Sequence, residues 1–513
     1  MAYVIGVDIG TQSTKALVVA EDGTVIAQHS QAYKVDTPRP GWAEQWPQVW
    51  LSAVYQCVAA CTQAAGVPKA QIKALCVSSL YGGSGIPVNA AFEPLHPCLI
   101  WMDRRAEAQV AQVLAQQNLA QLHEVTGNGV DSYYGFTKML WLKQQRPEVW
   151  AQMRWLLPPN SYVNHALTGQ LAVDHSSAGN IGGLYDINAR CWSEPMLQAL
   201  GIDSELMPQR LLYSGEVIGG LLAEPAALLG LAPGTAVLAG GVDAAMATFA
   251  AGVNRPGKHV AMIGTSMCWG YLAHSADARH GLVSFPHVYN GARDLYSFGG
   301  ALTAGASVSW FREQFCQAEV AQAATDGADP HQALEQMAAQ VPAGSDALLF
   351  LPYLMGERSP VWDAKASAAF IGLGLLHGKA HLYRAVLEGV TYALRHAIEA
   401  GQRATGELDR QLIVVGGASH SDLWMQIIAD VTGFEVVTIA QDVEAAYGAA
   451  LLAARAAGLV NDTQVEQGWV RLRHRATPNA TAAKRYGPLF EAYCQCYPAL
   501  KAVFHRLRSV QDE

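Results

Sequence analysis

A stretch near the start of the chain has the residue types that hold a phosphate group. The apolar run at residues 4–7 ends in the carboxylate of Asp8, and a second apolar run follows at residues 16–20. Small, hydroxyl-bearing and basic residues lie between them: Gly10, Thr11, Gln12, Ser13, Thr14 and Lys15. Glycine lets backbone N–H groups approach an anion, and hydroxyls and lysine donate hydrogen bonds to it. We expect a phosphate-holding hairpin, although taken alone the pattern is more typical of an ordinary hairpin with a polar turn.

Two carboxylates are placed where they could act beside such a phosphate. Asp8 would repel the anion directly, so its natural use is to hold a hydrated Mg²⁺. Asp243 follows Gly240-Gly241 at the end of an apolar run and precedes a helix of small residues at 244–251. A carboxylate there can face a cleft and accept the proton of a substrate hydroxyl. The commoner use of Asp at this position is to cap the helix, and both interpretations stay open.

Two further turns combine glycine with small or hydroxyl-bearing residues. The apolar run at residues 259–263 enters Gly264-Thr265-Ser266, so the triplet Ile-Gly-Thr occurs at residues 9–11 and again at 263–265. Both copies lie between expected strands, as a duplicated fold requires, but three matching residues also arise by chance. The third turn, Gly416-Gly417-Ala418-Ser419, follows an apolar run at 412–415. Its missing side chains would let a flat purine lie on the backbone.

The elements that must position these turns alternate between strands and helices. Helical spacing of apolar residues predicts helices at 47–65, 381–400, 422–432 and 444–457. Apolar runs predict strands at 24–27, 72–78 and 435–439, and a strand end carrying charges at 99–105. This order indicates a mixed α/β protein. The charged stretch 356–363 is dense in turn formers, and an ion-paired surface loop and a functional loop are equally open for it.

Composition narrows the class of protein. A length of 513 residues requires two or more domains, and 51% hydrophobic with 15% charged residues describes a well-buried globular chain. The net charge of −9 argues against nucleic acid as a partner. The nine cysteines show neither CxxC pairs nor zinc spacing. No signal peptide and no apolar stretch of bilayer length is visible, so we expect a cytoplasmic protein with reduced thiols and no membrane partner.

Taken together, the motifs resemble the FGGY carbohydrate kinases over almost the whole chain. The first phosphate turn, the segment ending in Asp243, and the turns at 264–266 and 416–419 each resemble a family motif. Two stretches are more specific, namely 356–363 and 368–388. The resemblance also covers Trp101-Met102-Asp103-Arg104-Arg105, which is similar to the strand end on the sugar side of the family's site.

The resemblance implies a fold and a reaction. The fold is α/β, with two ribonuclease-H-like (actin-like ATPase) domains around a central cleft: residues 1–240 for the sugar and 241–513 for ATP. The reaction transfers the γ-phosphoryl group of ATP to a sugar hydroxyl, with Asp243 as general base and Asp8 holding Mg²⁺. A homodimer is common in the family. The remaining implied contacts are to ATP (Gly10, Thr11, Gln12, Ser13, Thr14, Lys15, Gly264, Thr265, Gly416, Gly417, Ala418) and to the sugar (Tyr81, Trp101, Asp103, Arg104, Asp243).

The identity of the sugar is the least determined part of this prediction. The chain looks most like the pentulose kinases, which favours a ketopentose such as xylulose. Members that phosphorylate xylulose carry Gln-Met-His-Gly where this chain has Leu80-Tyr81-Gly82-Gly83, and residues 366–369 also depart from the common pattern. Glycerol, gluconate or another polyol therefore stay open as acceptors. Two other hypotheses are an actin-like ATPase without sugar transfer and a catalytically silent sugar sensor.

Overall fold

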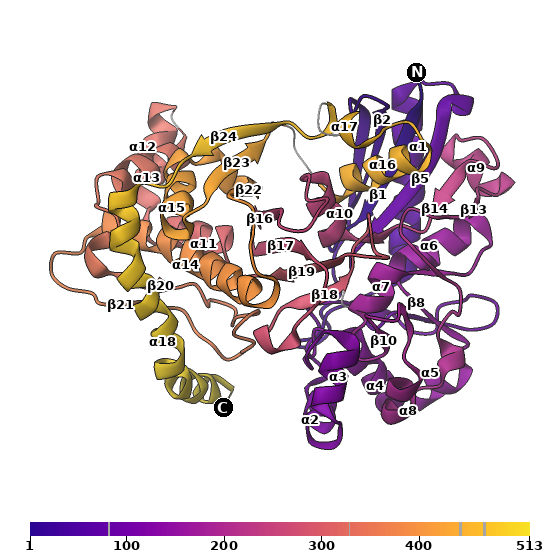
Figure 1. Cartoon of the computed structure of the whole chain (residues 1–513), viewed down its shortest axis with the longest axis horizontal. Coiled ribbons are helices and arrows are strands. Elements are labelled where there is room, and N and C mark those ends of the chain that lie inside the picture. The colour runs from indigo at the N-terminus through magenta and orange to yellow at the C-terminus, as the bar shows by residue number, and fades with distance from the viewer. Residues whose placement is uncertain (81–82, 328, 441–443, 465–467, 513) are drawn as a thin grey trace.

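The computed structural model describes residues 1–80, 83–327, 329–440, 444–464 and 468–512, and its elements form two lobes side by side (Figure 1). Each lobe is built around a seven-stranded sheet. Smaller two-stranded pairs complete the structure: β4 (Glu44–Gln45) with β7 (Cys98–Leu99), β6 (Ile86–Val88) with β8 (Trp155–Leu157), β9 (Val173–Asp174) with β12 (Leu211–Leu212), β10 (Tyr185–Asp186) with β11 (Cys191–Trp192), and β20 (Leu349–Leu351) with β21 (Ala369–Ile371).

The sheet of the first lobe begins with the hairpin expected from the sequence. In β1 and β2, Asp8 pairs with Lys15 and Ile9 with Thr14, so the polar turn lies between them. Strand β5 pairs in parallel with β1, and β14 pairs in parallel with β5. The order is β13 (Val217–Gly220), β14 (Ala236–Leu238), β5 (Ile72–Ser79), β1 (Tyr3–Ile9), β2 (Ser13–Ala20) and β3 (Val25–Ala32), with β15 (Gly241–Val242) also on β5.

The sheet of the second lobe repeats this plan. Strands β16 and β17 form an antiparallel hairpin that β19 extends, and β22 and β23 add in parallel on the other side. The order is β18 (Val283–Pro286), β19 (Leu295–Gly299), β17 (Met267–Ala273), β16 (His259–Ile263), β22 (Gln411–Val415), β23 (Glu435–Ile439) and β24 (Leu472–Ala476). Because β3-β2-β1-β5-β14 and β19-β17-β16-β22-β23 share one connectivity, the repeated Ile-Gly-Thr triplet marks equivalent turns of a duplicated fold. The predicted two-domain α/β class is confirmed.

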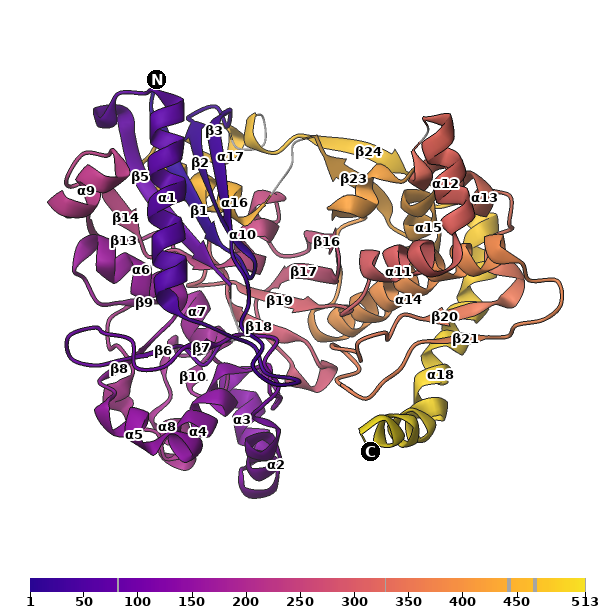
Figure 2. The ribbon, with the colours of Figure 1, turned by 180° about the vertical axis from the view of Figure 1, so that it is seen from behind.

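Both faces of the first sheet are covered, which explains why β1 is apolar on both sides. Helix α1 (Pro47–Ala65) covers the outer face (Figure 2) and matches its predicted bounds. Pro47 occupies its first turn, where the missing N–H costs nothing, and Gly66 ends it with φ of 60°. Helix α16 (Ala445–Ala456) covers the other face, although it comes from the C-terminal part of the chain.

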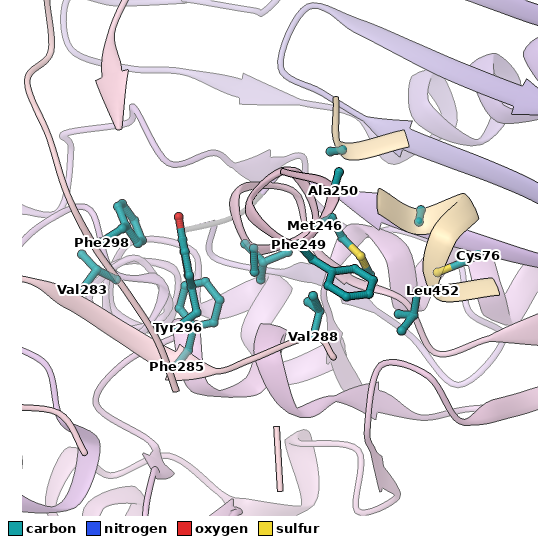
Figure 3. Packing of buried hydrophobic residues seen from close by; sticks show 14 of the residues in the cluster. Cys76, Met246, Phe249, Ala250, Val283, Phe285, Val288, Tyr296, Phe298 and Leu452 are labelled. Atoms are coloured by element: carbon teal, nitrogen blue, oxygen red, sulfur yellow. The ribbon is translucent and has the colours of Figure 1, made fainter. Parts of the chain in front are cut away.

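Helix α10 (Asp243–Ala250) packs between the lobes, and its neighbours approach it closely. A Cβ on Gly448 would lie 2.0 Å from the Met246 carbonyl, and one on Gly6 would lie 1.9 Å from the Ala446 carbonyl. Only glycine permits these approaches of α16 to α10 and β1. Met246 and Phe249 of α10 join one buried cluster with residues of both sheets (Figure 3). The helix that begins with Asp243 is therefore held by both lobes. The domain boundary after residue 240 remains a prediction.

The remaining helices complete the lobes. Those of the first lobe are α2 (Glu107–Gln116), α3 (Leu119–Thr126), α4 (Gly135–Gln145), α5 (Pro147–Gln152), α6 (Pro159–Thr168), α7 (His175–Asn180), α8 (Glu194–Leu200) and α9 (Ala223–Leu229). Later in the chain come α11 (Gly305–Phe315), α12 (Gln317–Asp326), α13 (Pro330–Ala339), α14 (Lys379–Thr405), α15 (Asp422–Thr432), α17 (Asp462–Gln464) and α18 (Ala480–Asp512). Within the described ranges, no helix is both long and apolar enough to cross a membrane.

One predicted strand is shorter than expected. The sequence suggests a strand end over residues 99–105, but only Cys98–Leu99 pair, with β4. The chain then turns, since the Asp103 N–H donates to the Ile100 carbonyl at 3.0 Å. The Asp103 carboxylate accepts the Arg105 N–H at 3.0 Å and the Ala43 N–H at 2.7 Å. These bonds satisfy the turn locally and replace a sheet ladder.

Candidate active site

Asp8 lies at the end of β1, where the neighbouring strands contribute polar side chains. The Ser78 hydroxyl on β5 donates to Asp8 Oδ1 at 3.0 Å. Lys15, opposite Asp8 on β2, forms an ion pair with Glu444 at 2.6 Å. Burial raises the pKa of Asp8, the Ser78 bond opposes that shift, and the nearby Glu444 charge adds to it. A cation bound beside Asp8 would stabilise the ionised form of its carboxylate.

Asp243 is the first residue of α10 and lies near Asp8. Burial raises the pKa of the Asp243 carboxyl, and the charge of Asp8 raises it further. Its Oδ1 accepts the Ala244 N–H at 2.6 Å, whereas Val242 occupies the N-cap position. Asp243 thus satisfies one helix N–H without being the cap residue. A half-buried carboxylate with a raised pKa beside a second carboxylate has the character of a proton acceptor.

The turn after β16 faces a large cavity in the second lobe. Gly264 and Thr265 are exposed, and their carbonyls accept the N–H groups of Gly305 and Ala306 at 2.9 and 3.0 Å. These bonds place the N-terminus of α11 beside the turn, where its dipole favours an anion. The cavity has a volume of about 1010 Å³.

The third predicted turn lines the same cavity. Gly417 and Ala418 border it together with Gly264 and Thr265. Gly416 shapes the turn, since its φ is 92° and a Cβ there would lie 2.6 Å from the Ile263 carbonyl. A cavity of this size with a glycine wall fits a nucleotide. The structure therefore brings together Gly264, Thr265, Gly417 and Ala418 on one cavity, and their expected contact with ATP stays a prediction.

The first turn is bonded to the segment after Leu99, which is expected to lie on the sugar side. The Thr11 hydroxyl accepts the Trp101 Nε1–H at 3.0 Å, and the Tyr33 hydroxyl donates to the Gly10 carbonyl at 2.7 Å. Thr14 is fully buried, with its hydroxyl 3.1 Å from that of Tyr33. Gln12 is exposed, and Ser13 and Lys15 are half-buried. Trp101 and Thr11 are thus in contact, while the Thr14 hydroxyl faces the protein interior.

The other residues predicted to contact the sugar differ in their surroundings. Arg104 is half-buried and pairs with Asp131 at 2.7 Å. Asp103 is fully buried and holds Arg105 at 2.8 Å, which indicates a structural role for that carboxylate in the turn. Tyr81 lies outside the described residues.

The stretch 356–363 is not the ion-paired surface loop that the sequence left open. Glu357 and Arg358 are 5% and 8% exposed. Burial raises the pKa of Glu357 to about 8. The Trp362 ring stacks on Tyr134, with 6.3 Å between centroids, so this loop of the second lobe contacts the first.

Several residues of the site were not predicted from the sequence. Ser78 lowers the pKa of Asp8, and Glu444 raises it. Asn180, Arg358 and Asp243 all act on the hydroxyl of Tyr133. Burial also lowers the pKa of Lys138 to about 7; its Nζ donates to the Tyr133 carbonyl at 2.9 Å. Lys138 lies in an apolar helical stretch typical of a protein core, and Asn180 ends the short polar helix at 175–180. Only the polar loop around Arg358 carried a signal in the sequence.

The carboxylates fit one magnesium ion better than a metal cage. Within the described part of the chain, no three His, Cys, Asp or Glu residues are grouped as metal ligands. Mg²⁺ is commonly held by one or two carboxylates together with water and substrate phosphates. The repulsion between Asp8 and Asp243 is the kind of strain that such a cation relieves.

Comparisons with known proteins agree with this arrangement. Residues 3–250 match the N-terminal domain of the FGGY family of carbohydrate kinases, and residues 259–457 match its C-terminal domain. A xylulose kinase of Lactococcus lactis is 30% identical over 100% of both chains. A gluconokinase of Bacillus licheniformis is 28% identical over 99% of this chain and 98% of its own. The crystal structure of a ligand-bound xylulose kinase from Lactobacillus acidophilus superposes with a TM-score of 0.90, 27% identity and coverage of 99% and 100%.

Proposed function

The chain belongs to the FGGY family of carbohydrate kinases, and from that premise we propose that it transfers the γ-phosphoryl group of ATP to a ketopentose such as xylulose. The observation that carries the proposal is the meeting of Asp8 and Asp243 between two lobes of duplicated fold. The relatives named xylulose kinase support the choice of a ketopentose.

In this proposal the nucleotide binds in the cavity of the second lobe. The purine lies on Gly417 and Ala418, and the phosphates pass the exposed Gly264-Thr265 turn toward the first lobe. Backbone N–H groups and the N-terminus of α11 stabilise the phosphate charge there. Lys15 and the first turn approach the phosphates from the opposite side once the lobes close.

Asp243 acts as the general base on the sugar hydroxyl. Its raised pKa makes the carboxylate a better proton acceptor than an ordinary Asp. The bond from the Ala244 N–H leaves Oδ2 to face the hydroxyl while Oδ1 is held in place. Phosphoryl transfer depends mostly on alignment and charge neutralisation, so a fixed base between two phosphate-holding turns suits it.

Asp8 is the residue that would hold Mg²⁺, oriented by Ser78. When bound, the ion neutralises phosphate charge and so favours attack by the hydroxyl. Closure of the two lobes would exclude water from the site and limit hydrolysis of ATP.

A second candidate acceptor is gluconate, since a gluconokinase is among the full-length relatives at 28% identity. A coupled ADP-release assay with Mg-ATP across ketopentoses, aldoses, polyols and aldonates distinguishes the candidates. We expect the highest kcat/KM with a ketopentose. Signal with gluconate alone would favour the second candidate, and ADP release independent of any sugar would favour an ATPase.

A further inference from the structure

The loop 356–363 belongs to the second lobe, is held there by hydrogen bonds, and contacts the first lobe. The Ser359 hydroxyl accepts the Gly300 N–H at 3.0 Å, and Glu357 Oε1 accepts the Leu302 N–H at 3.1 Å. Trp362 donates from Nε1 to the Gly281 carbonyl at 2.6 Å, and its ring lies 6.2 Å from that of Tyr133. The loop is therefore fixed at both ends, and what it carries is placed against Tyr133.

Arg358 is the cation that this loop carries inward. Its guanidinium carbon lies 5.5 Å from the centre of the Phe298 ring. The residue is buried, and its Nε finds no hydrogen-bond acceptor in the described structure. A buried donor of a charged group without an acceptor is costly, so its persistence indicates that a ligand supplies one.

Asn180 approaches the same place from the first lobe. It is the last residue of α7 and is fully buried. Its amide faces the Tyr133 hydroxyl but without a hydrogen bond of normal geometry, so that both Nδ2 and Oδ1 lack a partner among the residues described. An amide buried in this way offers one acceptor and two donors to a guest.

Both residues lie around the Tyr133 hydroxyl, on which the candidate base also acts. Burial raises the pKa of the Tyr133 hydroxyl; Arg358 opposes the shift and Asp243 adds to it. The Cys268 thiol is affected in the same way by Arg358 and Asp243. Unused donors from two lobes therefore converge around Tyr133, whose hydroxyl also senses the charge of Asp243.

We propose that Asn180 and Arg358 determine acceptor specificity by binding the carbonyl group of a ketose and the hydroxyl next to it. The inference rests on the proposed function. Arg358 Nε and Asn180 Nδ2 donate to the carbonyl oxygen, and Asn180 Oδ1 accepts from the neighbouring hydroxyl. A ketone oxygen accepts two such bonds without having to donate one, whereas an alditol places a hydroxyl hydrogen there. The acceptor is thereby held from both lobes.

The test compares Arg358→Met and Asn180→Ala with the wild type on D-xylulose and on xylitol, which lacks the carbonyl. Loss of a hydrogen bond to a charged group costs about tenfold to a hundredfold in affinity. We expect KM for xylulose to rise by that factor, the preference for xylulose over xylitol to collapse, and KM for ATP to stay unchanged. Arg395→Met is the matched control, because Arg395 also lies over a phenylalanine ring, 4.1 Å from the centre of Phe490, among other residues of the second lobe.

The possible outcomes test the proposed function and the role of Asn180 and Arg358 separately. Wild-type protein that phosphorylates neither compound contradicts the proposed function. A wild type that prefers xylulose while both variants retain that preference overturns the role of Asn180 and Arg358. A wild type that prefers gluconate, with that preference lost in Arg358→Met, overturns the ketose assignment in favour of a carboxylate. If Arg358→Met fails to fold, Asn180→Ala decides by the same ratio, with the xylulose-induced shift in melting temperature as a second readout.

Discussion

Asp8 and Asp243 come from the ends of two different elements and meet as a pair of carboxylates, with the charge of Asp8 adding to burial in raising the pKa of Asp243. The chain separates them by most of the first lobe, and the fold rejoins them because β15 pairs with β5, beside β1. This relationship gives the proposed chemistry its base and its metal-holding group in one place.

Removal of the Asp8 charge should weaken the response to magnesium. We expect Asp8→Asn to raise the Mg²⁺ concentration needed for half-maximal activity by roughly tenfold or more, about 1.4 kcal/mol. The readout is ADP release titrated with Mg²⁺ at fixed ATP and sugar. Glu205→Gln, which breaks only the exposed ion pair with Arg154, serves as the control and should shift the curve little. An unchanged titration in Asp8→Asn would exclude Asp8 as the metal-holding group.

Substitutions at Gly416 and Gly417, beside the proposed nucleotide cavity, should affect stability and ATP binding differently. In Gly416→Ala the new Cβ would lie 2.6 Å from the Ile263 carbonyl at φ of 92°, which should cost about 1–3 kcal/mol of stability. Gly417→Ala meets no atom within 4 Å and should melt as the wild type does. Gly417→Leu would extend into the cavity and should raise KM for ATP. Thermal melts and ATP kinetics of the three variants test this, and equal KM values for all would place the nucleotide elsewhere.

The buried ion pair of Arg384 and Glu388, within the stretch 368–388, should matter for stability and not for chemistry. Arg384 bonds Glu388 at 2.8 Å, and both side chains are buried. Glu388 also accepts from Tyr486 at 2.7 Å and from the Gly344 N–H at 2.9 Å. Arg384→Met would leave a buried charge without its partner and should cost about 3–5 kcal/mol in urea unfolding. Arg403→Met, in the exposed part of the same helix, should change stability by less than about 1 kcal/mol. Comparable losses in the two variants would contradict this prediction.

Buried histidine should make the protein acid-sensitive. Burial lowers the pKa of His259 from 6.5 to about 4. Its Nδ1 accepts from Trp269 at 3.2 Å, and its Nε2 lies 3.1 Å from the Asp409 carbonyl, so the ring is held neutral. Between pH 6.5 and 4, His259 is protonated in the unfolded chain and stays neutral in the folded chain. Stability is therefore retained above pH 6.5 and is lost as the pH falls toward 4, by about 1.4 kcal/mol per pH unit.

His259→Gln provides the comparison for that slope. The variant loses one titrating group, so its free energy of unfolding should fall less steeply from pH 6.5 to 4.5, although it is less stable at pH 7. Urea unfolding at several pH values measures both slopes. Identical slopes would mean that His259 is protonated in the folded state.

Much of the fold could be predicted because its signals are local. The hairpin of β1 and β2 follows from apolar runs around a polar turn, and α1 from helical spacing with Pro47 and Gly66 at its ends. What could not be predicted is the return of α16 to the first sheet. Its alanines and Gly448 indicate close packing, but they do not say against which strand. The shortened strand at Cys98–Leu99 reflects the bonds of Asp103, which periodicity does not reveal.

Some residues of the candidate site could likewise be predicted from local patterns, and others could not. The turn at Gly264-Thr265 could be predicted from its residue types. In the structure it lines one cavity together with Gly417. Thr14 has the right type, but its side chain points inward, because alternation along β2 sets its face. Asn180 and Arg358 come from parts of the chain far apart in sequence and lie near each other only around Tyr133, which no local pattern reveals. The expected homodimer stays a prediction.

The most direct test of Asp243 as the general base is acceptor-dependent ADP release by Asp243→Asn. Asn keeps an oxygen that can accept the Ala244 N–H, so helix α10 should remain intact and the melting temperature should change little. We expect kcat with xylulose to fall by about a hundredfold to ten-thousandfold while ATP binding persists. Full sugar-dependent activity in Asp243→Asn would contradict the assignment of Asp243 as the base, and with it the central claim.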